Sequence, residues 1–171
     1  MIADKNKYII EPLADHDRTA FSCGKEPLDR YIREHASQDV KRGLATVFVT
    51  AAKDDPKKVF AYYSLSNREL KLSQLPPEIA KKAGKYGSVG VTLLGRLACA
   101  TDSRGSGIGR LALIDALRRS VMASSEVGSF AVFGEAIDEE AVAFYKKYGF
   151  LELPDDKLKL FLPMRTSAKV F

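Results

Sequence analysis

The stretch Arg-Gly-Ser-Gly-Ile-Gly at residues 104–109 places glycines at alternate positions, Gly105, Gly107 and Gly109. Glycine tolerates positive φ angles and has no Cβ, so a ligand can approach its backbone closely. An apolar strand is expected before this stretch and a helix after it. Unpaired backbone N–H groups and the positive end of a helix dipole would then meet at one point, which favours a bound anion. The sequence therefore predicts a phosphate-binding loop here.

Three kinds of phosphate loop compete for this stretch. A Walker loop is excluded because no Gly-Lys-Ser/Thr follows the glycines. A dinucleotide fingerprint could use Gly105 and Gly107, but it has Arg110 where a third small residue belongs, and too little chain follows for a doubled sheet. The pattern Arg/Gln-x-x-Gly-x-Gly/Ala fits without adjustment as Arg104, Gly107 and Gly109. In this frame Gly105 helps the turn and lies outside the pattern.

The elements expected around the loop form an α/β unit. Residues 90–100 are typical of an apolar strand, and residues 108–122 predict a helix that is apolar around most of its circumference. A second strand is expected at 129–136, followed by a helix that Asp138 caps and Gly149 ends. The stretch 157–164 closes the chain as a last strand. This order predicts a right-handed crossover between parallel strands.

The first half of the chain predicts one amphipathic helix and an antiparallel strand pair. The helix covers residues 25–43, with Pro27 in its first turn, Gly43 at its end, and an apolar face of Leu28, Tyr31, Ile32, His35 and Ala36. Residues 44–51 and 58–66 predict the two strands. Residues 71–88 are interpreted as a connection that contains a short helix at 78–84. We therefore expect one domain over residues 1–171.

Composition narrows the classes of function. The formal net charge is +5, which mildly favours a polyanionic partner. The sequence has no apolar stretch typical of a membrane span and no secretory signal, so the expected compartment is the cytoplasm. Cys23 and Cys99 are expected to be buried free thiols, and with only His16 and His35 beside them no metal site is expected. Arg96, inside an apolar strand, is expected to meet a carboxylate or the mouth of a substrate site.

Two longer stretches resemble a known superfamily. Residues 94–117, LGRLACATDSRGSGIGRLALIDAL, and 141–150, AVAFYKKYGF, are similar to the GNAT superfamily of N-acetyltransferases. The segment FSCGKEPLDRYIREHA at 21–36 resembles the F-x-C-G-x-x-x-L-D signature of the acetyltransferase toxins of type II toxin–antitoxin systems. The resemblance implies a single-domain α/β GNAT fold: a mixed central sheet flanked by helices, with splayed central strands that form an acetyl-CoA cleft.

The resemblance also implies roles for particular residues. The backbone of Leu97, Ala98 and Cys99 is expected to pair with the pantetheine of acetyl-CoA. The pyrophosphate is expected to lie in a cradle formed by Arg104, Gly105, Ser106, Gly107, Ile108, Gly109 and Arg110. Tyr145 matches the tyrosine that the family places beside the coenzyme A sulfur, where it would donate a hydrogen bond as negative charge grows. Tyr148 is interpreted as packing.

The acceptor implied by the toxin resemblance is the amino group of an aminoacyl-tRNA, whose acetylation blocks translation. No general base stands out in the sequence, and a water relay to Glu135 or a backbone carbonyl stays open. Implied partners are a ribbon-helix-helix antitoxin, operator DNA bound through the antitoxin complex, and a second copy of the chain in a homodimer. We expect a tRNA-facing surface at Lys81, Lys82, Lys85, Lys146 and Lys147.

Two other readings of the sequence stay open. The chain could acetylate a small-molecule amine or a protein N-terminus without toxicity. It could also be a coenzyme A-binding regulator that has lost catalysis, although the intact loop and Tyr145 oppose that reading.

Overall fold

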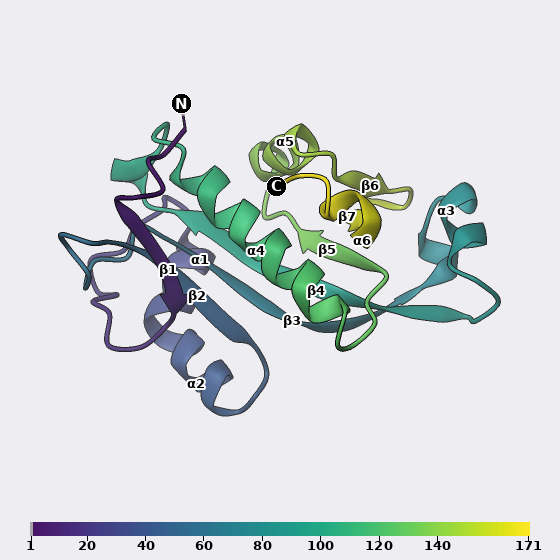
Figure 1. Cartoon of the computed structure of the whole chain (residues 1–171), viewed down its shortest axis with the longest axis horizontal. Coiled ribbons are helices and arrows are strands. Elements are labelled where there is room, and N and C mark those ends of the chain that lie inside the picture. Colours follow the sequence, from purple (N-terminus) through teal and green to yellow (C-terminus); the bar gives the residue numbers. More distant parts are fainter. Residues whose placement is uncertain (1) are drawn as a thin grey trace. The chain divides into compact units, whose positions relative to one another are not determined.

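The structure is a computed structural model that describes residues 2–171. Seven strands form a mixed sheet in the order β1-β2-β3-β4-β5-β7-β6, and helices lie between most of the consecutive strands (Figure 1). The strands are β1 Tyr8–Pro12, β2 Thr46–Ala52, β3 Ala61–Lys71, β4 Ser88–Cys99, β5 Ala131–Glu135, β6 Leu151–Leu153 and β7 Asp156–Pro163. The helices are α1 Glu26–Arg30, η1 Tyr31–His35, α2 Ala36–Lys41, η2 Leu72–Gln74, α3 Pro77–Lys82, η3 Thr101–Ser103, α4 Ile108–Ser124, α5 Glu139–Lys147 and α6 Met164–Ser167. The expected mixed α/β class is confirmed.

The chain comprises two compact units, and each takes its residues from two separate stretches. The first unit contains the residues up to Ser66 together with Arg96–Ala116, and the second contains Asn67–Gly95 and Leu117–Phe171. The strands β3 and β4 and the helix α4 each contribute residues to both units. Within residues 2–171, no helix is both long enough and apolar enough to cross a membrane.

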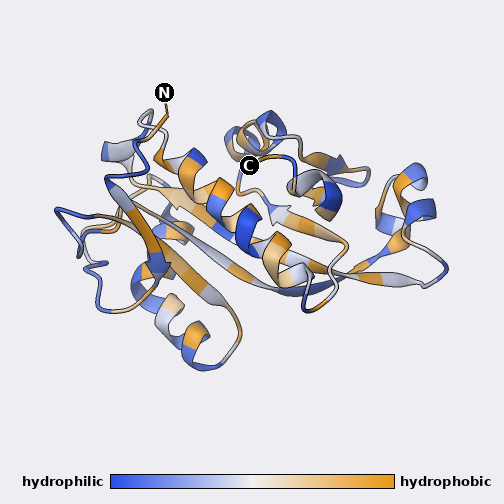
Figure 2. Cartoon of the chain, in the orientation of Figure 1, coloured by the Kyte–Doolittle hydropathy of each residue, from blue (hydrophilic) through white to orange (hydrophobic). Residues whose placement is uncertain are grey.

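In the first unit, β2 pairs antiparallel with β1 and with β3. Figure 2 shows that β2 is apolar along most of its length, and its Val47 and Val49 are buried. The antiparallel pair expected from the sequence is confirmed by the β2–β3 register, in which Phe48 lies opposite Tyr63. The core of this unit joins β2 to the first helices and to the end of β4, through Phe21, Cys23, Tyr31, Ile32, Ala36, Val47, Val49, Val59, Tyr62, Ala98 and Ala100.

The helix expected at 25–43 is present but contains one π turn. Between α1 and α2, the amide of Ala36 donates to the carbonyl of Tyr31, five residues earlier. The turn therefore holds one residue more than an α-helical turn, and this rotates the following residues around the helix axis. Ala36 is buried at the centre of the apolar face, while His35 is exposed. Placing His35 on that face was wrong because a uniform helical period was assumed.

In the second unit, β4 and β5 run parallel, as the strand–helix–strand order predicts. Their paired residues run from Thr92 opposite Val132 to Leu94 opposite Gly134, and β4 continues to Cys99. β5 also pairs antiparallel with β7. The short strand β6, which the sequence analysis did not anticipate, pairs with the other side of β7. The core of this unit contains Leu70, Leu75, Val91, Ala131, Phe133, Leu153 and Phe161.

The helix α5 begins and ends as its sequence predicts. Asp138 lies at its N-cap, where Oδ1 accepts a hydrogen bond from the amide of Ala141 at 3.0 Å. Gly149 follows the helix with φ of 94°, a left-handed conformation that favours glycine. Glu139 and Glu140 in the first turn and Lys146 and Lys147 in the last complement the helix dipole. Local chemistry thus fixes both ends of the helix that carries Tyr145.

Replacing Asp138 with Ala should lower the free energy of unfolding by about 1 kcal/mol, because the cap of α5 is lost. Urea unfolding followed by circular dichroism measures the difference. Asp138→Asn is the matched control, since its amide oxygen can still accept from Ala141, and it should differ from wild type by less than about 0.5 kcal/mol. Equal destabilisation by both variants would contradict a capping role.

Candidate active site

The glycine loop joins the end of β4 to α4 through a tight turn. After Cys99 the chain makes the short helix η3 and then turns at Gly105 and Gly107, whose φ angles are 76° and 85°. The first α-helical hydrogen bond runs from the amide of Leu111 to the carbonyl of Gly107, at 3.0 Å. The amides of residues 108–110 therefore belong to the first turn, where the helix itself supplies no acceptor. This is the anion-favouring arrangement that the sequence predicts.

The three glycines of the loop serve different purposes. A Cβ added to Gly105 would meet no heavy atom within 4 Å, so the left-handed backbone, and not crowding, requires glycine there. Gly107 likewise has a positive φ. Gly109 lies inside α4, and its amide donates a hydrogen bond to the sulfur of Cys99. Gly105, outside the sequence pattern, thus has the same conformational constraint as Gly107.

The two cysteines are free thiols near the loop. Burial, and then the nearby Asp29, raise the pKa of Cys23 to about 11. Burial also raises the pKa of Cys99, although the hydrogen bond from Gly109 and the charge of Arg104 oppose the shift. Both side chains therefore stay protonated at neutral pH, which disfavours a cysteine nucleophile in this unit. Cys23 is buried as expected, whereas Cys99 is only partly buried.

Arg104 is anchored by a segment about eighty residues upstream. Its Nη2 donates a hydrogen bond to the carbonyl of Cys23 at 2.6 Å. The neighbouring Gly24 has φ of 85°, and a Cβ there would lie 3.7 Å from Arg104 Nη2 and 3.7 Å from Thr101 Cγ2. The F-x-C-G signature, which was connected to the acceptor from the sequence, therefore contacts Arg104 and Thr101, just before the glycine turns.

Asp29, the last residue of the signature, has a structural role that the sequence analysis did not identify. Its carboxylate is buried, and Oδ1 accepts a hydrogen bond from the amide of Cys23 at 2.8 Å. The preceding Leu28 offers its carbonyl to the hydroxyl of Tyr62 at 2.6 Å. Phe21 packs edge-on against the same Tyr62 ring, with centroids 5.5 Å apart. An aspartate in an amphipathic helix gives no signal of this role, but its place in the signature could have suggested one.

The end of β4 presents the residues expected to pair with pantetheine. Ala98 is buried, while Leu97 and Cys99 are partly buried. Arg96 lies over the ring of Tyr31, with its guanidinium carbon 3.6 Å from the centroid. This cation–π contact lowers the cost of placing an arginine in an apolar strand. The partner of Arg96 is thus an aromatic ring, and no carboxylate pairs with it within residues 2–171.

In the second unit, the side chain of Tyr145 is buried and packs against β5 at Gly134. Its ring atoms Cε1 and Cζ lie 3.7 Å from the position that a Cβ of Gly134 would occupy, and its ring centroid is 5.1 Å from that of Phe150. The residue is 3% exposed, and this burial raises the pKa of its phenol above the ordinary range. Within the described residues, burial is the only cause of the shift, and no hydrogen bond adds to it. The phenol is therefore a hydrogen-bond donor and a very weak acid.

Glu135, the carboxylate considered for a water relay, forms an ion pair with Arg68. The Arg68 guanidinium also lies over the ring of Phe133, 5.2 Å from its centroid. Both charged side chains are partly exposed. Within residues 2–171, no group of three or more His, Cys, Asp or Glu side chains is placed to hold a metal ion.

Gly105→Ala should lower the free energy of unfolding by about 1 kcal/mol, because alanine must adopt a left-handed backbone there. Gly90→Ala is a matched control, since Gly90 also has open space around it but has no positive φ. That control should leave stability unchanged or raise it by up to about 1 kcal/mol. Thermal and urea unfolding measure both, and the same effect at the two glycines would refute the conformational explanation.

Comparisons with known proteins identify relatives along nearly the whole chain. A probable toxin, TacT, from Sinorhizobium fredii is 31% identical over 169 residues, which cover 94% of this chain and 93% of that protein. A tRNA-acetylating toxin from Mycobacterium tuberculosis is 33% identical over 149 residues, covering 87% of each chain. No protein-family model matches the chain.

Solved structures show the same fold. A Tyr-to-Phe variant of KacT superimposes with a TM-score of 0.90 at 29% identity, covering 96% of this chain and 99% of that one. AtaT in complex with acetyl-methionyl-tRNA superimposes with a TM-score of 0.87 at 27% identity, again covering 96% and 99%. The complex of AtaT and AtaR bound with acetyl-CoA gives a TM-score of 0.82 at 25% identity, covering 97% and 99%.

Proposed function

Because the chain belongs to the acetyltransferase toxins of the GNAT superfamily, we propose that it transfers the acetyl group of acetyl-CoA to the α-amino group of an aminoacyl-tRNA. The observation that carries the proposal is its similarity, over 87% of its length, to a tRNA-acetylating toxin. The structure of AtaT with acetyl-methionyl-tRNA supports the same product class. Acetylation would remove the amine that must attack in peptide-bond formation, and translation would stop.

The donor side of the site is proposed to use mainly backbone groups. The strand Leu97–Cys99 would pair with pantetheine, and the loop from Arg104 to Arg110 would hold the pyrophosphate. Two observations support this fit: Gly105 and Gly107 have left-handed backbones, and the space next to Gly105 is open. The first turn of α4 adds the positive end of its dipole. Acetyl-CoA supplies the activated acetyl group.

Tyr145 is proposed to donate a hydrogen bond to the coenzyme A sulfur as the thioester breaks. A phenol with a pKa of about 10 already yields its proton to a thiolate unfavourably, since the thiol has a pKa of about 8.5. Burial raises the pKa of Tyr145 further, which makes full transfer still less favourable. The stabilising effect is therefore electrostatic, and it strengthens as negative charge accumulates on sulfur.

The nature of the acceptor explains why no strong base is needed. An α-amine with a pKa of about 8 is neutral in roughly a tenth of molecules near pH 7, whereas a lysine amine is neutral in less than about a thousandth. The Glu135 carboxylate, the side chain considered for a water relay, is already engaged in an ion pair with Arg68. An acceptor with an α-amine suits this site better than a lysine side chain does.

The proposal is tested by incubating the protein with radiolabelled acetyl-CoA and charged tRNA. Label should enter aminoacyl-tRNA and be absent from uncharged tRNA. Tyr145→Phe should lower kcat by about 10²-fold or more, as loss of a transition-state donor does. Tyr148→Phe, at the C-cap of the same helix, should be near wild type. Label only in small amines or protein N-termini would contradict the proposed acceptor, and a fully active Tyr145→Phe would remove the role of the phenol.

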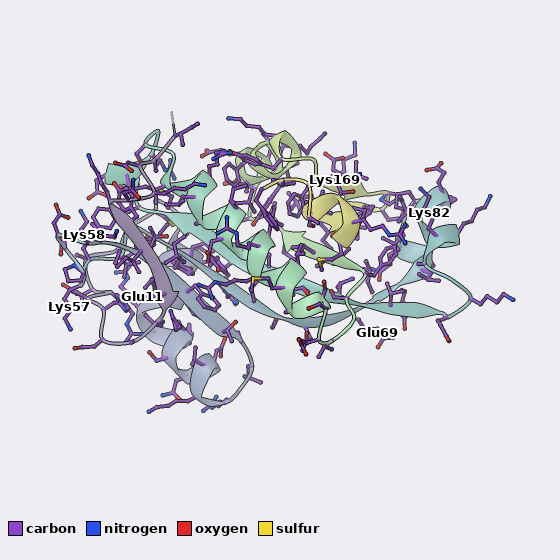
Figure 3. All side chains as sticks on the ribbon, in the orientation of Figure 1. Glu11, Lys57, Lys58, Glu69, Lys82 and Lys169 are labelled. Carbon is purple, nitrogen blue, oxygen red and sulfur yellow. The ribbon has the colours of Figure 1, made fainter. Side chains whose placement is uncertain are left out.

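The tRNA is proposed to contact a basic surface that includes α3 and the loop after it. Lys81, Lys82 and Lys85 are exposed, and Figure 3 shows Lys82 projecting from α3. Lys146 is also exposed but pairs with Glu152 at 3.1 Å, which reduces its attraction for phosphate. Lys147 lies 5.9 Å from the ring centroid of Tyr148. The first three lysines are therefore the stronger candidates for phosphate contacts.

Changing Lys81, Lys82 and Lys85 together to Glu should weaken tRNA binding by about tenfold or more at low salt, because phosphate contacts dominate such affinities. The slope of log affinity against log salt should become shallower by about two. Changing Lys5, Lys7 and Lys53, which are exposed in the first unit, gives the same change in net charge. An equal effect from both triple variants would show a response to net charge alone.

The binding partners proposed for this chain are those of the same family. Structures of AtaT with the C-terminus of AtaR and of KacTA with DNA exist among the neighbours. We propose that this chain is neutralised by a ribbon-helix-helix antitoxin, that the complex represses its own operon, and that the toxin is a homodimer. The proposed compartment is the cytoplasm, where charged tRNA is found.

A further inference from the structure

The signature segment holds the residues before the phosphate-binding loop at two points. The carbonyl of Ser22 accepts from the amide of Thr101 at 2.9 Å and from its hydroxyl at 3.3 Å. The next carbonyl, that of Cys23, accepts from the Arg104 guanidinium at 2.6 Å. Two consecutive carbonyls therefore fix both ends of the stretch 101–104, directly before Gly105. All these residues belong to the first unit.

The buried carboxylate of Asp29 fixes the backbone of Cys23 from the other side. Its Oδ1 accepts from the Cys23 amide at 2.8 Å, and its side chain is 6% exposed. Arg33, one turn later, balances the charge, with Nη2 at 3.9 Å from Oδ2. A charged acceptor gives a strong hydrogen bond, which limits rotation of the Cys23 backbone. The carbonyl of Cys23 is thereby held where it meets Arg104.

We propose that Asp29 is a positioning residue for the acetyl donor. Through Cys23 it fixes the side chain of Arg104 and the entry to the loop at 104–110, so that the loop is ordered before coenzyme A binds. The effect of preorganisation is on affinity, because a loop that is ordered in advance loses less freedom on binding. This inference rests on the proposed function, in which the pyrophosphate of acetyl-CoA occupies the loop.

The test compares Asp29→Ala with Asp29→Asn in the full chain. Asp29→Ala should raise KM for acetyl-CoA, and Kd for acetyl-CoA by calorimetry, by about tenfold, as the loss of one charged hydrogen bond would. Its kcat and its KM for aminoacyl-tRNA should stay within about twofold of wild type. Asp29→Asn keeps an oxygen that can accept from Cys23 and should restore most of the affinity. A folded Asp29→Ala with wild-type Kd and KM would overturn the proposal.

A double-mutant cycle with Arg104→Met separates positioning from a general loss of order. If Asp29 acts through Arg104, Asp29→Ala should raise Kd much less in the Arg104→Met background than in wild type, since coupled residues are non-additive. The same fold-change in both backgrounds would overturn the proposal. Tyr62→Phe removes the hydrogen bond to the carbonyl of Leu28, next to Asp29, and keeps the hydrogen bond between Asp29 and Cys23. That control should lower Tm and leave Kd unchanged.

A second variant covers the case in which Asp29→Ala does not fold. Gly24→Ala disturbs the same peptide through its backbone, because the φ there is 85°, and it should also raise Kd for acetyl-CoA. An unchanged Kd in Gly24→Ala would then overturn the proposal. Failure of the proposed function gives a different result: wild-type protein would transfer no label to charged tRNA, while calorimetry of acetyl-CoA would still compare the Asp29 and Gly24 variants.

Discussion

The hydrogen bond from the Arg104 guanidinium to the Cys23 carbonyl is the contact on which the arrangement of the first unit depends. It joins the segment before α1 to the segment before α4, and its two partners lie 81 positions apart in the sequence. The Asp29 carboxylate behind Cys23 and the left-handed Gly24 beside it both serve this contact. Cys23 belongs to the apolar core that contains Tyr62, and Arg104 directly precedes the glycine loop. The same contact therefore connects the packing of the core to the loop for which ligand binding is proposed.

The chemistry assigned to the two substrates makes unequal demands on the protein. The donor needs a large, ordered surface, because a long polyanionic carrier must be held by many weak contacts. Backbone amides and glycine turns supply these contacts, and both are readily available at the junction of a strand and a helix. The acceptor amine needs little activation, and in the proposed reaction the buried phenol of Tyr145 would assist only the departing sulfur. A site without a strong base is therefore consistent with the proposed reaction.

The sequence predicted those parts of the fold that depend on local chemistry. The cap at Asp138, the stop at Gly149 and the parallel strands around the glycine loop all follow from residue type and spacing, and the structure confirms them. The π turn could not be predicted, because one extra residue in a single turn does not visibly change the spacing of the apolar residues in the sequence. The contact of Arg104 with Cys23 also depends on tertiary packing. Roles of Tyr145 and of the loop residues in binding and catalysis stay predictions, since they depend on groups outside the chain.

The interleaving of the two units limits how this protein can change. Because the first unit is assembled from the residues up to Ser66 and from Arg96–Ala116, no continuous fragment encodes it, and the same holds for the second. A single crossover at any of the junctions would leave at least one unit with its two stretches from different parents. Neither unit can therefore be inherited as a separate module by simple recombination. Variation among relatives is expected to accumulate by point substitution around a fixed connectivity.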